Sequence, residues 1–306
     1  MKIYRLGVDT PPTRERACAL GFFDGVHLGH RRIIERCVGR ARELGLTPSV
    51  FTFFGEGGGF KPDKERIYTT EEKLEILASL GIEEAFVANF ESFSAVSAGD
   101  FVTDFLFGTL GVRLTVCGFN FRFGRGALGD AALLSELMRE LGGEALTEPE
   151  FKFENKTLSS SEVRRALAEG RTEKAEKMLG APYSVKGKIS HGLGLGRALG
   201  FPTVNIPLSE ASPLKNGVYL TRVKLDTGVY DALTNVGVCP TVGGRGRHIE
   251  AHLIDFSGEI YGSECRIYFI EFLREETEFP SLEGLKAQIT KDLNGIKEIK
   301  NVRKLD

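Results

Sequence analysis

The residues with the clearest chemical potential are two histidines, His27 and His30, in the segment GFFDGVHLGH at positions 21–30. They lie where an apolar run, Ala17–Phe22, that predicts a buried strand meets a predicted helix over Leu28–Leu44. Open α/β sheets bind ligands at such junctions, and free backbone N–H groups with the helix dipole favour phosphate there. Two imidazoles at this junction could donate hydrogen bonds to a triphosphate.

The glycines around the histidines fit the same interpretation. Gly25 and Gly29 remove side chains where a phosphate would approach, and Asp24-Gly25 is typical of a turn. A structural alternative is that Asp24 only caps the helix and that both histidines belong to a solvated first turn.

Two further segments carry groups that could meet a nucleotide. In GFNFRFGRGALGD (118–130), phenylalanines alternate with Asn120 and Arg122 after a predicted strand. This pattern also fits a strand with one apolar face, or an RNA-binding sheet, whose spacing of basic, glycine and aromatic residues it does not match. The second segment, Ser159–Ser161 followed by Arg164, predicts either an ordinary helix cap at Ser160 or Ser161 or a second phosphate clamp.

In the second half, the segment GLGLGRALGFPTVN (192–205) contains neither a dinucleotide-binding fingerprint nor a P-loop. Pro202 fixes the entry to an extended segment in which Thr203 and Asn205 project to the same side. Hydroxyl and amide oxygens are hard ligands suited to Mg²⁺. An ordinary strand start is the alternative.

A further polar group of side chains is His248, Glu250 and His252, which share one face at strand period. That face invites a metal interpretation, although the Pro-Cys-x-x-Cys that follows His-x-Glu in zinc deaminases is missing. Glu250 as a lone carboxylate base is more economical, and a plain polar strand face stays open.

Two regions with different patterns must position these groups. Up to about residue 155, strand-like and helix-like segments alternate, which predicts an α/β domain with a doubly wound parallel sheet. Capping patterns mark the helix starts. The expected elements are a first helix ended by Gly45, strands over Ser49–Phe54, Ala85–Ala88 and Val112–Cys117, and helices starting at Thr69, Ser97 and Asp130, the second ending near Gly111 and the third running to Leu141.

Residues 160–180 predict two short helices closed by Gly170 and Gly180, and Ala181-Pro182 marks a border. We therefore expect two domains, residues 1–181 and 182–306. In the second, six or so short strands between glycine-rich turns predict a small antiparallel β-barrel, closed by a terminal helix over Ser281–Leu293. The clearest strands are 183–189, 217–225, 229–236, 248–256 and 264–273.

The composition limits the class of protein. The 306 residues are 42% hydrophobic, and 40 basic and 42 acidic side chains give a formal charge of −2. This balance lacks the basic face that nucleic-acid binding needs, yet it allows small phosphorylated ligands. Five scattered cysteines without Cys-x-x-Cys, no signal-peptide stretch and no apolar run of about 18 residues predict a reduced, cytoplasmic enzyme away from the membrane.

Taken in order, the N-terminal segments resemble the adenylyltransferase module of bacterial bifunctional riboflavin kinase/FAD synthetases, with its GxFDGxHxGH loop, G-x-(D/N)-F-R-F-G segment and serine-rich stretch before arginine. Thr70-Glu71-Glu72-Lys73 also resembles a helix start of that family. The resemblance implies a Rossmann-like nucleotidyltransferase domain that transfers AMP from ATP to the phosphate of FMN, by alignment and charge stabilisation. It implies catalytic roles for His27, His30 and Arg164, and nucleotide contacts from Gly21, Phe22, Asp24, Gly25, Gly29, Asn120, Ser160 and Ser161.

The second half resembles riboflavin kinase domains through GxxLGRxLGFPTxN, Gly217-Val218-Tyr219, Asn235-Val236-Gly237, Glu250-Ala251-His252 and Leu273-Arg274-Glu275-Glu276. The resemblance implies a six-stranded barrel that phosphorylates the ribityl 5′-hydroxyl of riboflavin with MgATP. Glu250 would take the hydroxyl proton, Thr203 and Asn205 would hold Mg²⁺ and ATP, and Arg274 would lie beside the flavin. Further implied substrate contacts are Gly192, Gly196, Arg197 and Asn235.

Three positions depart from these families. Gly57-Gly58-Gly59 replaces a proline- and histidine-bearing loop and adds conformational entropy, Val204 stands where alanine is usual, and Glu278 where lysine is common. The glycines predict weaker or differently gated adenylyl transfer, so a riboflavin kinase with an impaired adenylyltransferase domain is the alternative to the bifunctional enzyme. A flavin-binding regulator without turnover is disfavoured because binding alone needs no base. Self-association stays open.

Overall fold

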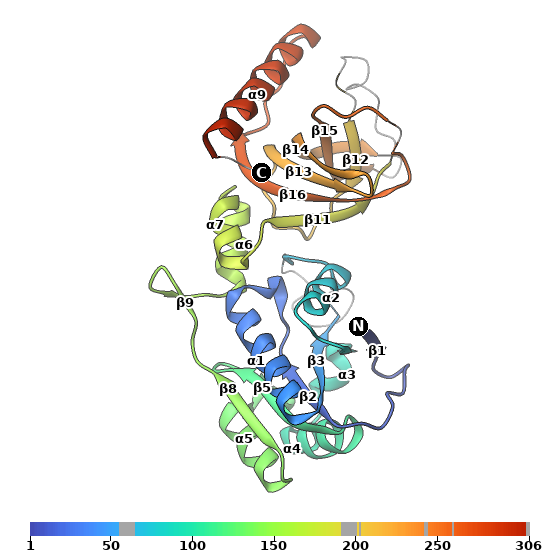
Figure 1. Cartoon of the computed structure of the whole chain (residues 1–306), viewed down its shortest axis with the longest axis vertical. Helices are drawn as coiled ribbons and strands as arrows, with labels where there is room; N and C mark the ends of the chain where they lie inside the picture. Colours follow the sequence, from blue (N-terminus) through green and yellow to red (C-terminus); the bar gives the residue numbers. More distant parts are fainter. Residues whose placement is uncertain (55–64, 191–200, 202, 242–243, 259, 304–306) are drawn as a thin grey trace. The chain divides into compact units, whose positions relative to one another are not determined.

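The computed structural model of the chain describes residues 1–54, 65–190, 201, 203–241, 244–258 and 260–303 (Figure 1). Its contacts divide the chain into two compact units, Met1–Glu162 and Val163–Asp306. This division falls before the expected border at 181/182. The reason is that α7 (Thr172–Leu179) packs on strands of the second unit, where the Thr172 hydroxyl donates a hydrogen bond of 3.0 Å to the carbonyl of Ile270.

The first unit contains the expected parallel sheet. Its six strands lie in the order β1-β4-β3-β2-β5-β8, and every neighbouring pair is parallel. The doubly wound α/β prediction is therefore confirmed. The two edge strands, β1 and β8, are short and more exposed than the others, so no apolar run marks them in the sequence. The strands are β1 (Lys2–Arg5), β2 (Arg16–Leu20), β3 (Thr47–Phe53), β4 (Glu84–Ala88), β5 (Val112–Gly118) and β8 (Glu144–Glu148).

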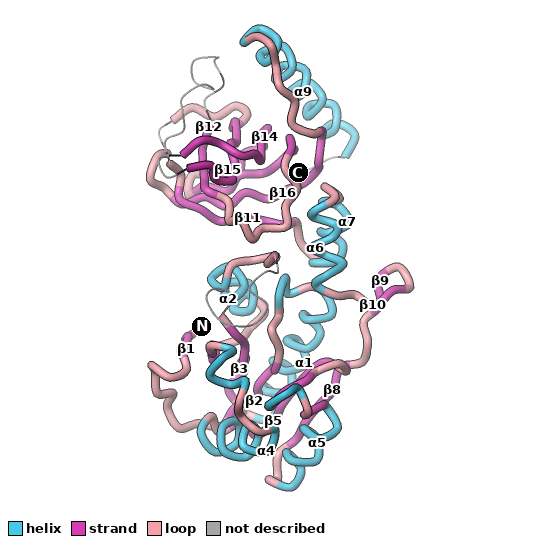
Figure 2. The backbone as a smooth tube through the Cα atoms, turned by 180° about the vertical axis from the view of Figure 1, so that it is seen from behind, coloured by secondary structure: helices cyan, strands magenta, loops and turns pink. Residues whose placement is uncertain are grey.

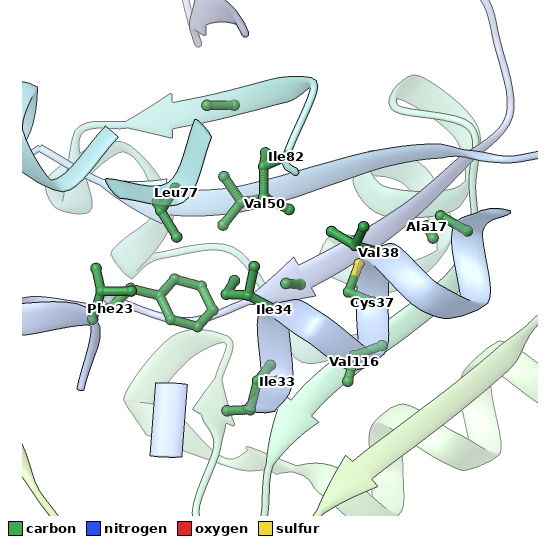
Figure 3. Packing of buried hydrophobic residues seen from close by; sticks show 14 of the residues in the cluster. Ala17, Phe23, Ile33, Ile34, Cys37, Val38, Val50, Leu77, Ile82 and Val116 are labelled. Atoms are coloured by element: carbon green, nitrogen blue, oxygen red, sulfur yellow. The ribbon is translucent and has the colours of Figure 1, made fainter. Parts of the chain in front are cut away.

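Helices cover both faces of this sheet because its central strands are apolar on both sides. On one face, α1 (Leu28–Leu44) buries Ile34, Cys37 and Val38 against Ala17 and neighbouring strand residues (Figure 3). On the other face lie the helices that follow β4 and β5. The elements around the sheet are α2 (Thr70–Ser79), α3 (Phe90–Ser94), α4 (Ala98–Asp100), η2 (Phe101–Thr109), α5 (Ala131–Glu140), η1 (Asp24–Val26), η3 (Arg125–Ala127) and the small hairpins β6 (Arg122–Phe123) with β7 (Gly129–Asp130) and β9 (Lys152–Phe153) with β10 (Lys156–Thr157).

The helix boundaries follow local chemistry. Helix α1 has the predicted bounds and ends at Gly45, whose φ of 68° is in the left-handed region that glycine adopts without strain. Thr69 forms the predicted capping box with Glu72. Asp130 caps α5 by accepting from a backbone N–H. One expectation needs correction: the segment after Ser97 is a single α-turn that continues as the π-helix η2, not a regular α-helix.

The second unit is an antiparallel sheet of six strands in the order β11-β16-β13-β14-β15-β12, which confirms the predicted class (Figure 2). Its edge strands meet, since Ser190 N–H donates to the carbonyl of Asn205 at 2.8 Å. The terminal helix is longer than predicted. The elements are α6 (Ser160–Ala168), α7, β11 (Tyr183–Lys188), β12 (Thr203–Pro207), β13 (Gly217–Leu225), β14 (Gly228–Thr241), β15 (Gly244–Leu253), β16 (Glu264–Arg274) and α9 (Leu282–Arg303).

Candidate functional sites

The first site lies where the order of the parallel sheet reverses. From β2 the chain proceeds to β3 and β4 on one side and then returns to β5 on the other side of β2. The loops after β2 and β5 therefore flank a crevice at the carboxyl ends of adjacent strands, the usual ligand position in open α/β sheets. The predicted segments 21–30 and 118–130 both begin at this edge.

The two histidines form a stacked pair at the start of α1. His27 is the N-cap residue, and its Nδ1 accepts a hydrogen bond of 3.3 Å from the His30 N–H. The ring centroids lie 3.7 Å apart. Burial lowers the pKa of His27 to about 4 and holds the pKa of His30 well below its usual range, with His27 and Lys73 lowering it further. Both rings are therefore neutral near pH 7, and because Nδ1 of His27 accepts a hydrogen bond, its proton resides on Nε2.

The loop between β2 and α1 is held in a strained conformation. Phe23 and Val26 have φ angles of 55° and 42°, which non-glycine residues, and β-branched ones above all, rarely adopt. Such residues cost about 1–3 kcal/mol each and persist only where surrounding contacts impose them. Two anchors are visible: Asp24 Oδ1 accepts from the Ile67 N–H at 3.1 Å, and the Ser160 hydroxyl donates to the Asp24 carbonyl at 2.9 Å.

The close packing of this loop explains why glycine stands at positions 25 and 29. Gly25 has a φ of 79°, and a Cβ built there would lie 2.6 Å from Ile67 Cδ1. A Cβ at Gly29 would lie 3.3 Å from the His27 ring. The glycines therefore permit the loop to approach its own supports as well as any phosphate.

A cavity of about 890 Å³ opens beside this loop. Its wall includes Gly21, His30 and Asn120. Most of the remaining wall is aromatic, which suits a flat apolar ring system with a few polar contacts at its edge. The phenylalanines that line it are Phe22, Phe23, Phe51, Phe53, Phe90, Phe93, Phe101, Phe121 and Phe123. Sequence reasoning singled out Phe22 and the phenylalanines of 118–130 but did not predict the wall as a whole, because its other members come from separate segments of the chain.

The serine-rich stretch plays a different local role from the one predicted. Ser159, rather than Ser160 or Ser161, caps α6, since its Oγ accepts from the Glu162 N–H at 3.4 Å. The reason is that Ser160 turns its hydroxyl to the Asp24 carbonyl. Arg164 follows one turn along α6 but belongs by contacts to the second unit, so the clamp made by Ser161 and Arg164 stays a prediction.

The second site is built from side chains on paired strands. In the register, Glu250 of β15 lies opposite Asn205 of β12 on one side and opposite Asn235 of β14 on the other. His252 lies opposite Thr203 in the same way. Because directly opposed residues share a face, these polar side chains gather on one face of the sheet. A cavity of about 340 Å³ is lined by Thr203, Asn235, Glu250 and His252, together with Arg274, Glu276 and Asp292.

Glu250 is electrostatically suited to accept a proton. Burial raises the pKa of its carboxyl, and the nearby Glu276 carboxylate raises it further, while His248 lowers it. Glu276 is itself held by Asn235, whose Nδ2 donates to Oε1 at 3.1 Å. A raised pKa makes a carboxylate a stronger base while it is still ionised near neutral pH.

Arg274 connects this cavity to the terminal helix. Its guanidinium donates to Asp292 of α9, with Nη2 at 2.8 Å from Oδ2, and Gln288 Nε2 donates to Asp292 Oδ1 at 2.7 Å. Sequence reasoning missed Asp292, and it included Glu276 in a motif without assigning it a role. The available signal was an acidic residue four positions after Gln288 in a helix that follows Arg274 closely.

The predicted metal positions carry suitable oxygen donors. Asn205 Nδ2 lies 3.5 Å from Thr203 Oγ1, so the two side chains share a side of β12 as predicted. Val204 lies opposite the small Ala251, which leaves room for the extra methyl groups. Among the residues with described positions, no three His, Cys, Asp or Glu side chains gather as metal ligands, so the alternative of a metal on His248, Glu250 and His252 gains no support. Gly192, Gly196 and Arg197 lie outside the described residues, as do Gly57-Gly58-Gly59.

Comparisons with known proteins match both halves of the chain. Residues 9–162 match the family model described as FAD synthetase, and residues 179–300 match the one described as riboflavin kinase. Relatives named bifunctional riboflavin kinase/FMN adenylyltransferase are similar over nearly the full length. The one from Haemophilus influenzae is 34% identical and that from Escherichia coli K12 35% identical, with 94% and 95% of this chain and 95% and 96% of the relatives covered. The relative from Bacillus subtilis is 34% identical over 94% of this chain and 93% of its own length.

A solved structure shares the whole architecture. The crystal structure described as a macrolide-efflux protein from Streptococcus pneumoniae superposes with a TM-score of 0.84 at 28% identity, covering 96% of this chain and 98% of that one. Within the described part of this chain, none of the helices is long and apolar enough to cross a membrane.

Proposed function

The chain belongs to the family of bifunctional riboflavin kinases and FMN adenylyltransferases, and on this premise we propose which residues carry its two reactions. It phosphorylates riboflavin to FMN with ATP and adenylylates FMN to FAD with a second ATP, releasing pyrophosphate. The observation that carries the assignment of roles is the pairing of each cavity with a distinct polar group. His30, whose ring stacks on that of His27, lines the aromatic cavity of the first unit, and Glu250 lines the cavity of the second.

In the first unit, a phosphate oxygen of FMN attacks the α-phosphorus of ATP, a P–O bond forms, and the bond to pyrophosphate breaks. No covalent enzyme intermediate is required, so alignment and charge stabilisation provide the catalysis. His27 donates from Nε2 to an ATP phosphate oxygen, and His30 contributes beside it. The strained loop through Gly21, Phe22, Asp24, Gly25 and Gly29 binds the nucleotide together with Asn120, Ser160 and Ser161. The catalytic role of Arg164 is proposed on the strength of the motif alone.

The neutral state of the histidines supports this role. A neutral imidazole donates one hydrogen bond and releases it without breaking an ion pair, which suits a group that must let pyrophosphate leave. The free N–H groups at the start of α1 add favourable electrostatics for the same phosphates. The aromatic wall supports binding of the flavin ring.

In the second unit, Glu250 removes the proton of the ribityl 5′-hydroxyl as that oxygen attacks the γ-phosphorus of ATP, and ADP leaves. Its raised pKa and its position between two asparagines support this role. Asn235 and Arg274 contact substrate from the cavity wall. Gly192, Gly196 and Arg197 are proposed to bind ATP on the strength of the motif alone.

Thr203 and Asn205 are proposed to hold Mg²⁺ with ATP. The donor set fits, because Mg²⁺ takes few protein oxygens and completes its shell with water and substrate phosphates. The 3.5 Å contact of Asn205 Nδ2 with Thr203 Oγ1 places the two side chains on one side of β12, so a rotated amide would present its oxygen beside the hydroxyl. When bound, the ion neutralises charge on the transferring phosphate.

We further propose that the partners of the enzyme are its small-molecule substrates, that nucleic acid and membranes are not among its partners, and that it works in the cytoplasm. The formal charge of −2 supports the exclusion of nucleic acid because no excess of basic groups is present. Self-association is left to direct measurement of mass in solution.

One incubation tests the assignment. Purified protein is mixed with riboflavin and MgATP, and flavins are resolved by chromatography over time. FMN followed by FAD supports the proposal. FMN without FAD supports the alternative of an impaired adenylyltransferase, for which the full-length matches provide no support, and neither product indicates a flavin-binding regulator.

A further inference from the structure

Lys73 is a buried lysine at the edge of the first site, and burial lowers the pKa of its amino group to about 7. Its side chain lies on α2 and the residue is 3% exposed. The ammonium donates to the Phe22 carbonyl at 3.1 Å, to Thr52 Oγ1 at 3.0 Å and to the Phe53 carbonyl at 2.9 Å. All three ammonium donors are therefore used, and none of the three acceptors is an anion.

The hydrogen bonds of Lys73 connect β2 and β3 just beyond the point where their backbone pairing ends. Strands β2 and β3 pair as far as Leu20 and Phe51, and one more backbone bond, from Gly21 N–H to the Phe51 carbonyl, closes the ladder at 3.2 Å. Beyond that point β2 and β3 are no longer paired. Lys73 then bridges the carbonyls of Phe22 and Phe53, and the Thr52 hydroxyl adds a bond of 3.0 Å to the Phe22 carbonyl.

The bridged residues lead directly into the functional elements. Phe22 precedes the strained loop that ends at His27, and the rings of Phe22 and Phe53 both line the aromatic cavity. The Lys73 ammonium also lies 4.8 Å from the centre of the Phe22 ring, a cation–π contact that fixes the ring against it.

We propose that Lys73 is a positioning residue for adenylyl transfer. It holds the end of β3 and the strained loop between β2 and α1 at the spacing that the flavin and ATP require. This inference rests on the proposed adenylyltransferase role of the first unit. The charge of Lys73 also supports adenylyl transfer, because it lowers the pKa of His30 and so helps to keep that ring neutral.

Lys73→Met tests the proposal in the full-length enzyme, with Lys152→Met, a change at an exposed lysine of the same unit, as the matched control. FAD formation from supplied FMN and MgATP is measured as a function of FMN concentration. We expect kcat to fall about 100-fold and KM for FMN to rise about tenfold, since misplacement by about 1 Å has effects of this size. Riboflavin phosphorylation by the same samples and both activities of Lys152→Met should stay within about twofold of the wild type.

The KM for FMN separates positioning from mere stability. A partly unfolded enzyme loses active molecules, which lowers kcat but leaves KM unchanged, so an unchanged KM overturns the proposal, as does wild-type kcat. If Lys73→Met does not fold, Thr52→Val is the second test, because it keeps two of the hydrogen bonds of the Lys73 ammonium. We expect a several-fold rise in KM for FMN, and an unchanged KM would overturn the proposal. Absence of FAD formation by the wild type would instead refute the proposed function itself.

Discussion

The two units build their sites in opposite ways. In the first, the functional groups lie on loops beyond the ends of strands, and their geometry depends on supports from Ile67, Lys73 and Ser160 that are remote in sequence. In the second, Asn205, Glu250 and Asn235 lie on adjacent strands, and the register alone aligns them. A loop site can therefore be disabled without touching a reacting group, whereas a site on paired strands depends mainly on the reacting side chains themselves.

The largest expected effect is at the second site. Glu250→Gln keeps the shape of the side chain but removes the proposed base, so the rate of FMN formation should fall by about 10²–10⁴-fold. FAD formation from supplied FMN should remain within about twofold of the wild type. Both rates are measured by chromatography on one preparation, and parallel loss of both activities would contradict the division of labour between the units.

Gly25→Ala tests the same comparison at the first site. The new Cβ meets Ile67 Cδ1 at a φ of 79°, so the loop must move, and FAD formation should fall about 100-fold while FMN formation is preserved. The double change Gly25→Ala with Ile67→Ala removes the clash but not the backbone strain, and should recover part of the lost rate. Full activity of Gly25→Ala would show that loop geometry is unimportant.

The buried histidines predict a pH dependence of stability in the first unit. Because the folded pKa of His27, about 4, lies below the unfolded value of 6.5, the unfolded state binds more protons between these values. The free energy of unfolding should therefore fall as the pH falls from about 6.5 to 4, by up to about 3 kcal/mol from His27.

Denaturant titrations at several pH values measure this effect, with His27→Asn as the comparison. Asparagine can supply the capping acceptor but does not titrate. The unfolding free energy of the wild type minus that of the variant should therefore decrease on acidification. A constant difference between pH 6.5 and 4 would contradict the neutral, buried state of His27.

The smallest expected effect concerns the terminal helix. Asp292→Asn weakens its charge-assisted contact with Arg274, which frees α9 beside the cavity of the second unit, and should raise KM for riboflavin about tenfold with little change in kcat. Steady-state phosphorylation kinetics measure both constants. A change at Asp231, paired with Arg222 away from the cavity residues, provides the control.

Local signals in the sequence were sufficient for much of the fold. The bounds of α1, the capping box at Thr69 and the cap at Asp130 depend on neighbours within four residues, and each was predicted. The class of both sheets followed from periodicity. The π-helix η2 was not predictable in this way, because its apolar sequence fits an α-helix equally well.

The site was less accessible from the sequence where it depends on long-range contacts. The His27–His30 pair was found because a short motif carries it, while Lys73 meets Phe22 and Phe53 across 51 and 20 positions. A weak signal existed, since Lys73 falls on the same stripe of α2 as the buried Leu77, where a lysine is out of place unless it has buried partners. The aromatic wall left no comparable signal.

The two ring nitrogens of His27 have two separate roles in our assignment. Its Nδ1 holds the first turn of α1, while its Nε2 proton is the one available to a phosphate. Asparagine reproduces the geometry of the first nitrogen and glutamine approaches that of the second, so no other standard side chain serves both. The helix and the proposed phosphate contact thus constrain this position jointly, and a substitution here should separate folding from turnover according to which nitrogen it imitates.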